Sequence, residues 1–154
     1  MKIEVPMGEF VVSKEDDCLI APAVGSCLVI TMHEHILKIG GMIHAMLPHS
    51  KDSFGSFMLE EIPDGKYVDI AIDLALEKMK AFGGEPENIE AKVVGGANMF
   101  GLYHPDIGKD NFLSAKKKLR EVGVKLTRAS IGGSIGRSVE FSVFSGIVKV
   151  ILTL

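Results

Sequence analysis

Cys27 and His44 are the two residues of this sequence whose types and positions best suit nucleophilic catalysis. Cys27 closes a small-residue turn, Gly25-Ser26-Cys27, that opens directly into an apolar run, and His44 lies in the next apolar segment. A thiolate attacks carbonyl carbons, and an imidazole on a neighbouring strand can act as its base. Backbone N–H groups of the turn, at Gly25, Ser26 and Cys27, lower the pKa of the thiol and can bind an oxyanion. The turn and the histidine together predict a hydrolytic site with a cysteine nucleophile.

Both residues also have a structural interpretation that the sequence leaves open. Free cysteine is among the most buried residue types, so Cys27 is also a candidate for a small core side chain. A lone histidine on an apolar strand is commonly a core or groove residue. Strand alternation divides its segment into two faces, one with Met42, His44 and Met46 and one with Ile43, Ala45 and Leu47. If the second face packs on the core, His44 points toward a partly open side.

Metal and nucleotide sites are weaker interpretations. Short spacings typical of structural zinc sites are missing among Cys18, Cys27, His33, His35, His44 and His49. We therefore expect no metal or other cofactor, with His33 and His35 solvated in a polar turn. The glycine-rich segment 132–136 lacks the lysine of a phosphate loop and precedes a strand pattern, so its glycines belong to a turn. Arg137 is then structural or binds a carboxylate or substrate, and Asp69 and Asp73 form a solvated helix face.

Length and composition place the chain among soluble globular proteins. Its 154 residues suit one domain, with 47% hydrophobic and only 6% aromatic residues. The formal net charge of −3 gives no general attraction to nucleic acid or anionic lipid. The N-terminus does not resemble a signal peptide, and no apolar run approaches the roughly 20 residues that cross a bilayer. We expect a cytoplasmic protein in which Cys18 and Cys27 are free thiols.

An α+β layer architecture is predicted, because strand patterns are numerous and helical patterns few. We expect strands at 3–5, 9–12, 18–21, 28–32, 42–47, 89–94, 125–130, 137–143 and 147–152, and helices at 66–82 and 109–122. The first helix should bury Val68, Ala71, Ile72, Ala75 and Met79. Pro22 and the polar triplet 33–35 should each end a strand, and Asp64 should cap the first helix. The glycines 40 and 41 permit a positive φ or a bulge, and residues 49–56 predict a surface loop beside the site.

Several short segments, taken in order, resemble one protein family. They are Gly25-Ser26-Cys27, 39–44 with 46–48, 67–71, 92–97, 107–111, and Gly132-Gly133 with Gly136-Arg137. Their order and spacing together are specific, and they cover nearly the whole chain. The sequence resembles the CheD family of chemoreceptor glutamine deamidases.

The resemblance implies a single deamidase domain over residues 1–154, folded as a layered α/β/β sandwich of two packed β-sheets with two helices on one face. It implies hydrolysis of glutamine side chains to glutamate on the cytoplasmic helical bundle of chemoreceptors, without a cofactor and without membrane insertion. By position, Cys27 is the nucleophile and His44 the general base and acid of a reaction that passes through a thioester. A CheC-type phosphatase is the implied binding partner.

Position 21 departs from the family pattern, which commonly has a threonine there to orient the histidine. Ala21 carries no hydroxyl group, so either another group orients His44 or activity is reduced. The sequence therefore keeps a second function open, that of a weakly catalytic or non-catalytic chemotaxis adaptor that binds CheC or receptors. Methyl-ester hydrolysis on the same receptors is a third, because it would use the same cysteine and histidine.

Overall fold

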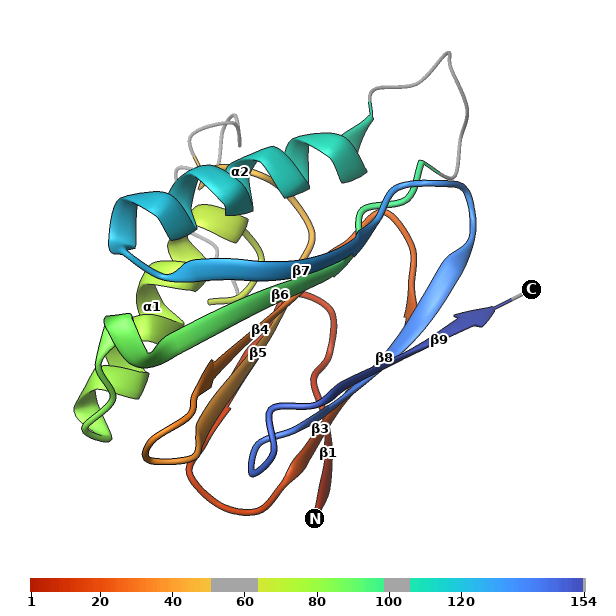
Figure 1. Ribbon diagram of the computed structural model, residues 1–154. Coiled ribbons are helices and arrows are strands. Elements are labelled where there is room, and N and C mark those ends of the chain that lie inside the picture. The colour runs from red at the N-terminus through yellow and green to blue at the C-terminus, as the bar shows by residue number, and fades with distance from the viewer. Residues whose placement is uncertain (51–63, 99–105, 154) are drawn as a thin grey trace.

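Three layers make up the fold seen in the computed structural model, which describes residues 1–50, 64–98 and 106–153. A four-stranded sheet, in the order β1-β3-β8-β9, packs against a five-stranded sheet in the order β2-β5-β4-β6-β7. Helices α1 and α2 lie on the outer face of the five-stranded sheet (Figure 1). The predicted α/β/β layering of two sheets with two helices on one face is confirmed for the described residues.

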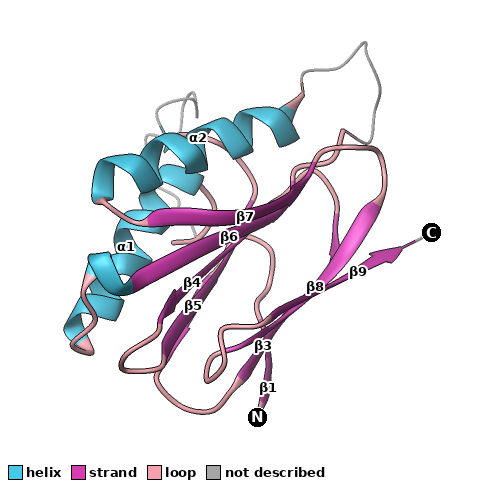
Figure 2. Ribbon diagram, viewed as in Figure 1, coloured by secondary structure: helices cyan, strands magenta, loops and turns pink. Residues whose placement is uncertain are grey.

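Figure 2 distinguishes the strands, helices and loops of the described residues. The strands are β1 Lys2–Glu4, β2 Phe10–Ser13, β3 Cys18–Val24, β4 Leu28–Glu34, β5 Ile39–Ala45, β6 Ile89–Gly95, β7 Lys125–Ile131, β8 Gly136–Ser142 and β9 Val148–Thr153. The helices are α1 Val68–Ala81, the 3-10 turn η2 Pro86–Asn88 and α2 Ile107–Val122. Within the described ranges no helix is long and apolar enough to span a membrane.

Strands β4 and β5 lie in the interior of the five-stranded sheet and are covered on both faces. One hydrophobic cluster fills the space between this sheet and the helices, and a second fills the space between the two sheets. All seven residues of β5 are buried as a result. Burial on both sides explains why these strands read as nearly continuous apolar runs rather than as alternating ones.

Gly40 and Gly41 serve close packing, and neither adopts the positive φ or the bulge that paired glycines permit. Both glycines lie in the regular β4–β5 ladder, and the positive φ nearby belongs to Lys38. A Cβ atom on Gly40 would lie 2.9 Å from Cε2 of Phe141 in the opposite sheet. The missing side chain therefore lets the sheets approach at this point.

Two predicted strand ends are also wrong. β3 continues past Pro22 to Val24 because a register shift after Ala21 forms a bulge there, where proline removes no ladder hydrogen bond. β4 extends through His33 to Glu34, since both residues have ladder partners in β5 and β6. Polarity alone did not end the strand.

The first helix starts at Val68 and not at residue 66, and Asp64 does not cap it. Tyr67 occupies the cap position without a side-chain cap, and it pairs with Leu47 in an isolated β-bridge. The carbonyl of Lys66 accepts hydrogen bonds from Met46 and Leu47 N–H groups at 2.9 and 3.1 Å. These contacts hold residues 66 and 67 extended, so the helix begins after them.

The other helix predictions are confirmed, except for the start of α2. The buried face of α1 contains all five predicted residues together with Leu76. α2 begins two residues earlier than expected, at Ile107, because Asp106 caps it by accepting a hydrogen bond from Lys109 N–H at 3.0 Å. Gly123 ends α2 in the left-handed conformation with φ of 77°. Most of the predicted loop at 49–56 lies outside the described residues.

The Gly40 contact predicts a stability difference between two adjacent glycines. We expect Gly40→Ala to lower the free energy of unfolding by about 1–3 kcal/mol, because the methyl group overpacks the ring of Phe141. Gly41→Ala is the matched control, since its Cβ would lie 3.3 Å from a single methyl group of Val12, which can shift. Urea denaturation followed by circular dichroism measures both. Equal losses would show that the sheet-to-sheet contact is not the constraint.

Candidate active site

The chain crosses from the four-stranded to the five-stranded sheet at the turn that contains Cys27. β3 ends at Val24 and β4 begins at Leu28, so residues 25–27 form the crossing. In the β4–β5 ladder, Val29 lies opposite His44. Cys27 is two residues before Val29 and packs with it in the cluster between the sheets. The register therefore makes Cys27 and His44 diagonal neighbours on one face, a relation in which Cα atoms are about 7–8 Å apart and long or ring side chains make contact.

His44 is buried, and both its backbone and its ring make hydrogen bonds. Its side chain is on the face between the sheets, where the residue is only 4% exposed. The expectation that it points toward a partly open side is wrong, because the second sheet covers that face. Its backbone N–H donates to Glu9 O at 2.9 Å, and its carbonyl accepts from Gly8 N–H at 2.8 Å.

The ring of His44 is oriented by a backbone carbonyl. Nδ1 lies 3.1 Å from Val5 O, and a carbonyl oxygen only accepts, so Nδ1 carries the proton and Nε2 keeps its lone pair. Burial lowers the pKa of His44, an effect that the Val5 carbonyl and the charge of Glu4 partly offset. The imidazole is therefore neutral at pH 7. Nε2 is buried and has no hydrogen-bond partner among the described residues.

Cys27 is a half-buried free thiol whose acidity differs from the prediction. Burial raises the pKa of Cys27, and a hydrogen bond from its own backbone N–H only partly offsets this. The predicted lowering of the thiol pKa toward neutrality is wrong for the structure without substrate. No hydrogen bond joins the thiol to Nε2 of His44, so the resting pair is a neutral thiol and a neutral imidazole.

The turn at residues 25–27 is fixed by its carbonyl groups. The three carbonyl oxygens accept, in chain order, from Ala97 N–H at 3.0 Å, the Asn111 side chain at 3.1 Å and Gly96 N–H at 2.9 Å. In the described part of the chain, none of the N–H groups of Gly25, Ser26 or Cys27 donates to another residue. The turn thus combines occupied acceptors with available donors beside the thiol.

Sequence reasoning missed the group that orients His44. Ala21 is fully buried in the cluster between the sheets and offers no polar atom to the ring. The Val5 carbonyl takes the orienting position instead. A backbone carbonyl has no residue type, so no sequence signal could have identified it. Asn111 lies in segment 107–111, which contributes to the family resemblance, but the sequence did not predict its contact with the Cys27 turn.

The other candidate residues have structural roles. Arg137 is buried and donates to Gly95 O at 3.0 Å and Gly132 O at 2.9 Å, so it ties strand ends together and binds no carboxylate among the described residues. His33 is not simply solvated, because its Nε2 donates to Val143 O at 2.9 Å and burial lowers its pKa. His35 is exposed and bonds to Asn88 O.

The two aspartates of α1 both have side-chain partners, so they are not simply a solvated helix face. Asp73 pairs with Lys118 of α2 at 3.0 Å, and Asp69 lies 3.7 Å from Nδ1 of His49. Both remain at least partly exposed, as expected for that face. Across the described ranges, no group of three or more His, Cys, Asp or Glu side chains is arranged to hold a metal ion.

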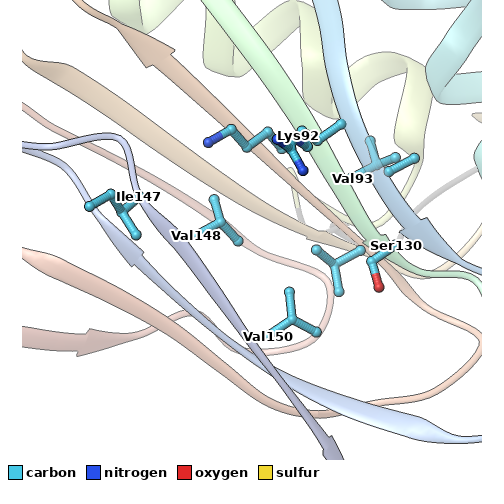
Figure 3. Close-up of a pocket in the computed structure, with 9 residues that line it drawn as sticks. Lys92, Val93, Ser130, Ile147, Val148 and Val150 are labelled. Carbon is cyan, nitrogen blue, oxygen red and sulfur yellow. The ribbon is translucent and has the colours of Figure 1, made fainter.

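Two of the cavities lined by described residues bear on the surroundings of the site, and neither is lined by Cys27 or His44. One of about 410 Å³ opens between β6 and β7 on one side and β9 on the other. Figure 3 shows Lys92, Val93 and Ser130 on one wall and Ile147, Val148 and Val150 on the other. The second, of about 240 Å³, lies at the start of α2 and is lined by residues that include Gly96, Gly108 and Phe112. Gly96 also contacts the Cys27 turn, so this second cavity adjoins it.

Comparison with known proteins gives one consistent result. The family model described as "CheD chemotactic sensory transduction" matches residues 46–151. The chain is 36% identical over 146 residues to the chemoreceptor glutamine deamidase CheD of Thermotoga maritima, which covers 95% of this chain and 88% of the relative. It is 34% identical over 144 residues to the protein of that name from Halalkalibacterium halodurans, covering 91% and 86%. A probable chemoreceptor glutamine deamidase CheD of Thermococcus kodakarensis is 32% identical over 152 residues, covering 97% and 91%.

The raised pKa of Cys27 predicts the pH dependence of its alkylation. Iodoacetamide reacts with the thiolate, so modification of Cys27 in the folded protein should be slow at pH 7 and should accelerate only above the ordinary titration range of a thiol. Peptide mass spectrometry after timed quenching measures the rate, and the same protein in urea gives the unfolded reference. A folded-state rate that is already maximal at neutral pH would contradict the neutral pair.

Proposed function

Because the chain belongs to the CheD family, we propose that it is a chemoreceptor glutamine deamidase that uses Cys27 as nucleophile and His44 as general base and acid. The relatives that carry this activity in their names match over most of their length. The observation that carries the proposal is the β4–β5 register, which puts His44 beside Val29 and thus diagonal to Cys27. The N–H groups of the turn at residues 25–27, which donate to no other described residue, add the donors that acyl transfer needs.

The first half of the reaction begins from the neutral pair. Nε2 of His44 accepts the thiol proton as the sulfur of Cys27 attacks the carbon of the glutamine side-chain amide. The Val5 carbonyl, already bonded to Nδ1–H, stabilises the imidazolium that forms. That imidazolium then protonates the departing nitrogen, the C–N bond breaks, and ammonia leaves a thioester on Cys27.

The second half restores the enzyme. Neutral His44 takes a proton from water as the oxygen attacks the thioester carbon, and the C–S bond breaks. The sulfur regains a proton, and the substrate carries a carboxyl group where the amide stood. One water is consumed and one ammonia released for each glutamine converted, and no metal or organic cofactor takes part.

The turn at residues 25–27 is proposed as the oxyanion site, with Gly25 and Ser26 N–H groups beside that of Cys27. The three carbonyl oxygens of the turn all accept hydrogen bonds from the protein, and these bonds fix the peptide planes. In each plane the N–H group points away from the carbonyl oxygen. Donors held in place before the reaction stabilise the developing charge without reorganisation, and each is worth roughly 3 kcal/mol of barrier.

A second function, a weakly catalytic or non-catalytic adaptor, is favoured by specific features of this chain. Ala21 lacks the hydroxyl expected by the family pattern, the pKa of Cys27 is raised, and Nε2 of His44 is not bonded to the thiol. The adaptor would bind receptors or a CheC-type phosphatase, in the cytoplasm, without rapid turnover. We place the deamidase first because the Val5 carbonyl supplies the orientation that Ala21 cannot.

Incubation with a chemoreceptor cytoplasmic fragment in ¹⁸O-labelled water separates these functions. The deamidase should convert specific glutamines to glutamates that carry the heavy oxygen, detected by peptide mass spectrometry. Cys27→Ala should abolish the conversion, and His44→Ala should slow it by about 10²- to 10⁴-fold, the contribution of general acid and base catalysis.

The matched control is Cys18→Ala, which removes the other thiol and should leave the rate unchanged. Receptor binding without conversion by the unmodified protein would favour the adaptor. Conversion by Cys27→Ala would reject the assigned nucleophile. A methylated receptor fragment in parallel tests whether esters are also hydrolysed.

A further inference from the structure

We propose that Asn111 of α2 is a positioning residue that fixes the spacing between Cys27 and His44. Its Nδ2 donates to Ser26 O and to Met46 O, each at 3.1 Å. Ser26 precedes the nucleophile, and Met46 follows His44 by two residues. One NH₂ group thus joins the turn that carries the thiol to the end of the strand that carries the imidazole. The proposal rests on the proposed deamidase function.

The need for such a link follows from where the ladder stops. The last pair of the β4–β5 ladder is Leu28 with Ala45, so Cys27 and Met46 lie beyond it. No ladder hydrogen bond sets the distance between those two segments. The Asn111 side chain bonds to both segments from outside the sheet, and its two hydrogen bonds take the place of a further ladder pair.

The helix that carries Asn111 is held against the turn by a second contact. A Cβ on Gly108, one helical turn earlier, would collide with the carbonyl oxygen of Gly96. Glycine at 108 therefore lets the start of α2 touch the loop after β6. Gly96 N–H in turn donates to Cys27 O at 2.9 Å. Helix α2 is therefore linked to the residue before the nucleophile directly, through Asn111, and to the nucleophile itself through Gly96.

Burial of Asn111 argues that its amide is retained for a purpose other than stability alone. The residue is fully buried, and its Oδ1 has no hydrogen-bond partner among the described residues. An unpartnered buried polar atom destabilises the fold, and an apolar side chain of similar size would avoid that loss. The two hydrogen bonds of Nδ2 are what asparagine adds at this position.

Ser114, one turn further along α2, provides a matched control. Its Oγ donates to Pro48 O at 2.7 Å, so it also bonds to a carbonyl of the segment after β5 and is also buried. Its Oγ also lies 3.3 Å from Nδ1 of His49. Among the described residues, no hydrogen bond joins Ser114 to the Cys27 turn. Loss of the two Ser114 hydrogen bonds should therefore affect stability without changing the distance between Cys27 and His44.

Asn111→Leu and Ser114→Ala are to be compared on the full chain under conditions in which urea denaturation shows both variants folded. We expect Asn111→Leu to lower kcat for glutamine conversion by about 10- to 100-fold, as displacements near 1 Å do, with KM changed less than about twofold. Ser114→Ala should keep both constants. Equal kcat losses in the two variants, or a change confined to KM, would overturn the positioning role.

Alkylation of Cys27 supplies a readout that does not depend on deamidation. Without the Asn111 link the turn loosens, so iodoacetamide should modify Cys27 several-fold faster in Asn111→Leu than in Ser114→Ala, with Cys18 unaffected. If the unmodified protein shows no deamidation, the proposed function fails, and this difference in alkylation still decides whether Asn111 holds the turn. Identical rates in the two variants would reject the link.

Discussion

Coverage of the five-stranded sheet on both faces is the constraint on which the site depends. Helices cover one face of β5 and the four-stranded sheet covers the other, so His44 is buried although it is polar. A buried imidazole is stable when it is neutral and its N–H has an acceptor. The Val5 carbonyl meets that requirement from the segment after β1. The packing of the two sheets therefore determines both the tautomer and the charge of the proposed base.

The neutral pair changes how activation of the thiol must be understood. A cysteine next to a cationic group is a thiolate at rest and reacts with any electrophile. Here burial disfavours both the thiolate and the imidazolium, so in the proposed mechanism the ion pair forms only when an attacked carbonyl accepts the negative charge. Such an arrangement limits reaction with unrelated electrophiles. The rate enhancement must then come from the relative positions of the two side chains and from the N–H groups of the turn.

Sequence patterns predicted the elements because local periodicity and glycine stops determine them, as in α1 and at Gly123. They failed where a contact with a distant segment decides the backbone. Residues 66 and 67 are extended because they bond to residues 46 and 47, and Gly40 is required by Phe141 of the other sheet. The choice of Cys27 and His44 came from residue type. Their burial, their pKa values and the role of Val5 arise only from packing of the two sheets.

Polar side chains of the interior gather where the ladders end around the Cys27 turn. His44, Asn111 and Arg137 each bond to backbone carbonyls, those of Val5, of Ser26 and Met46, and of Gly95 and Gly132. Each also leaves one buried atom unpartnered within the described residues. A fold optimised only for stability would avoid three such atoms in one region. Local rules are broken most often at functional sites, and the presence of these atoms around the Cys27 turn supports the active site that we propose there.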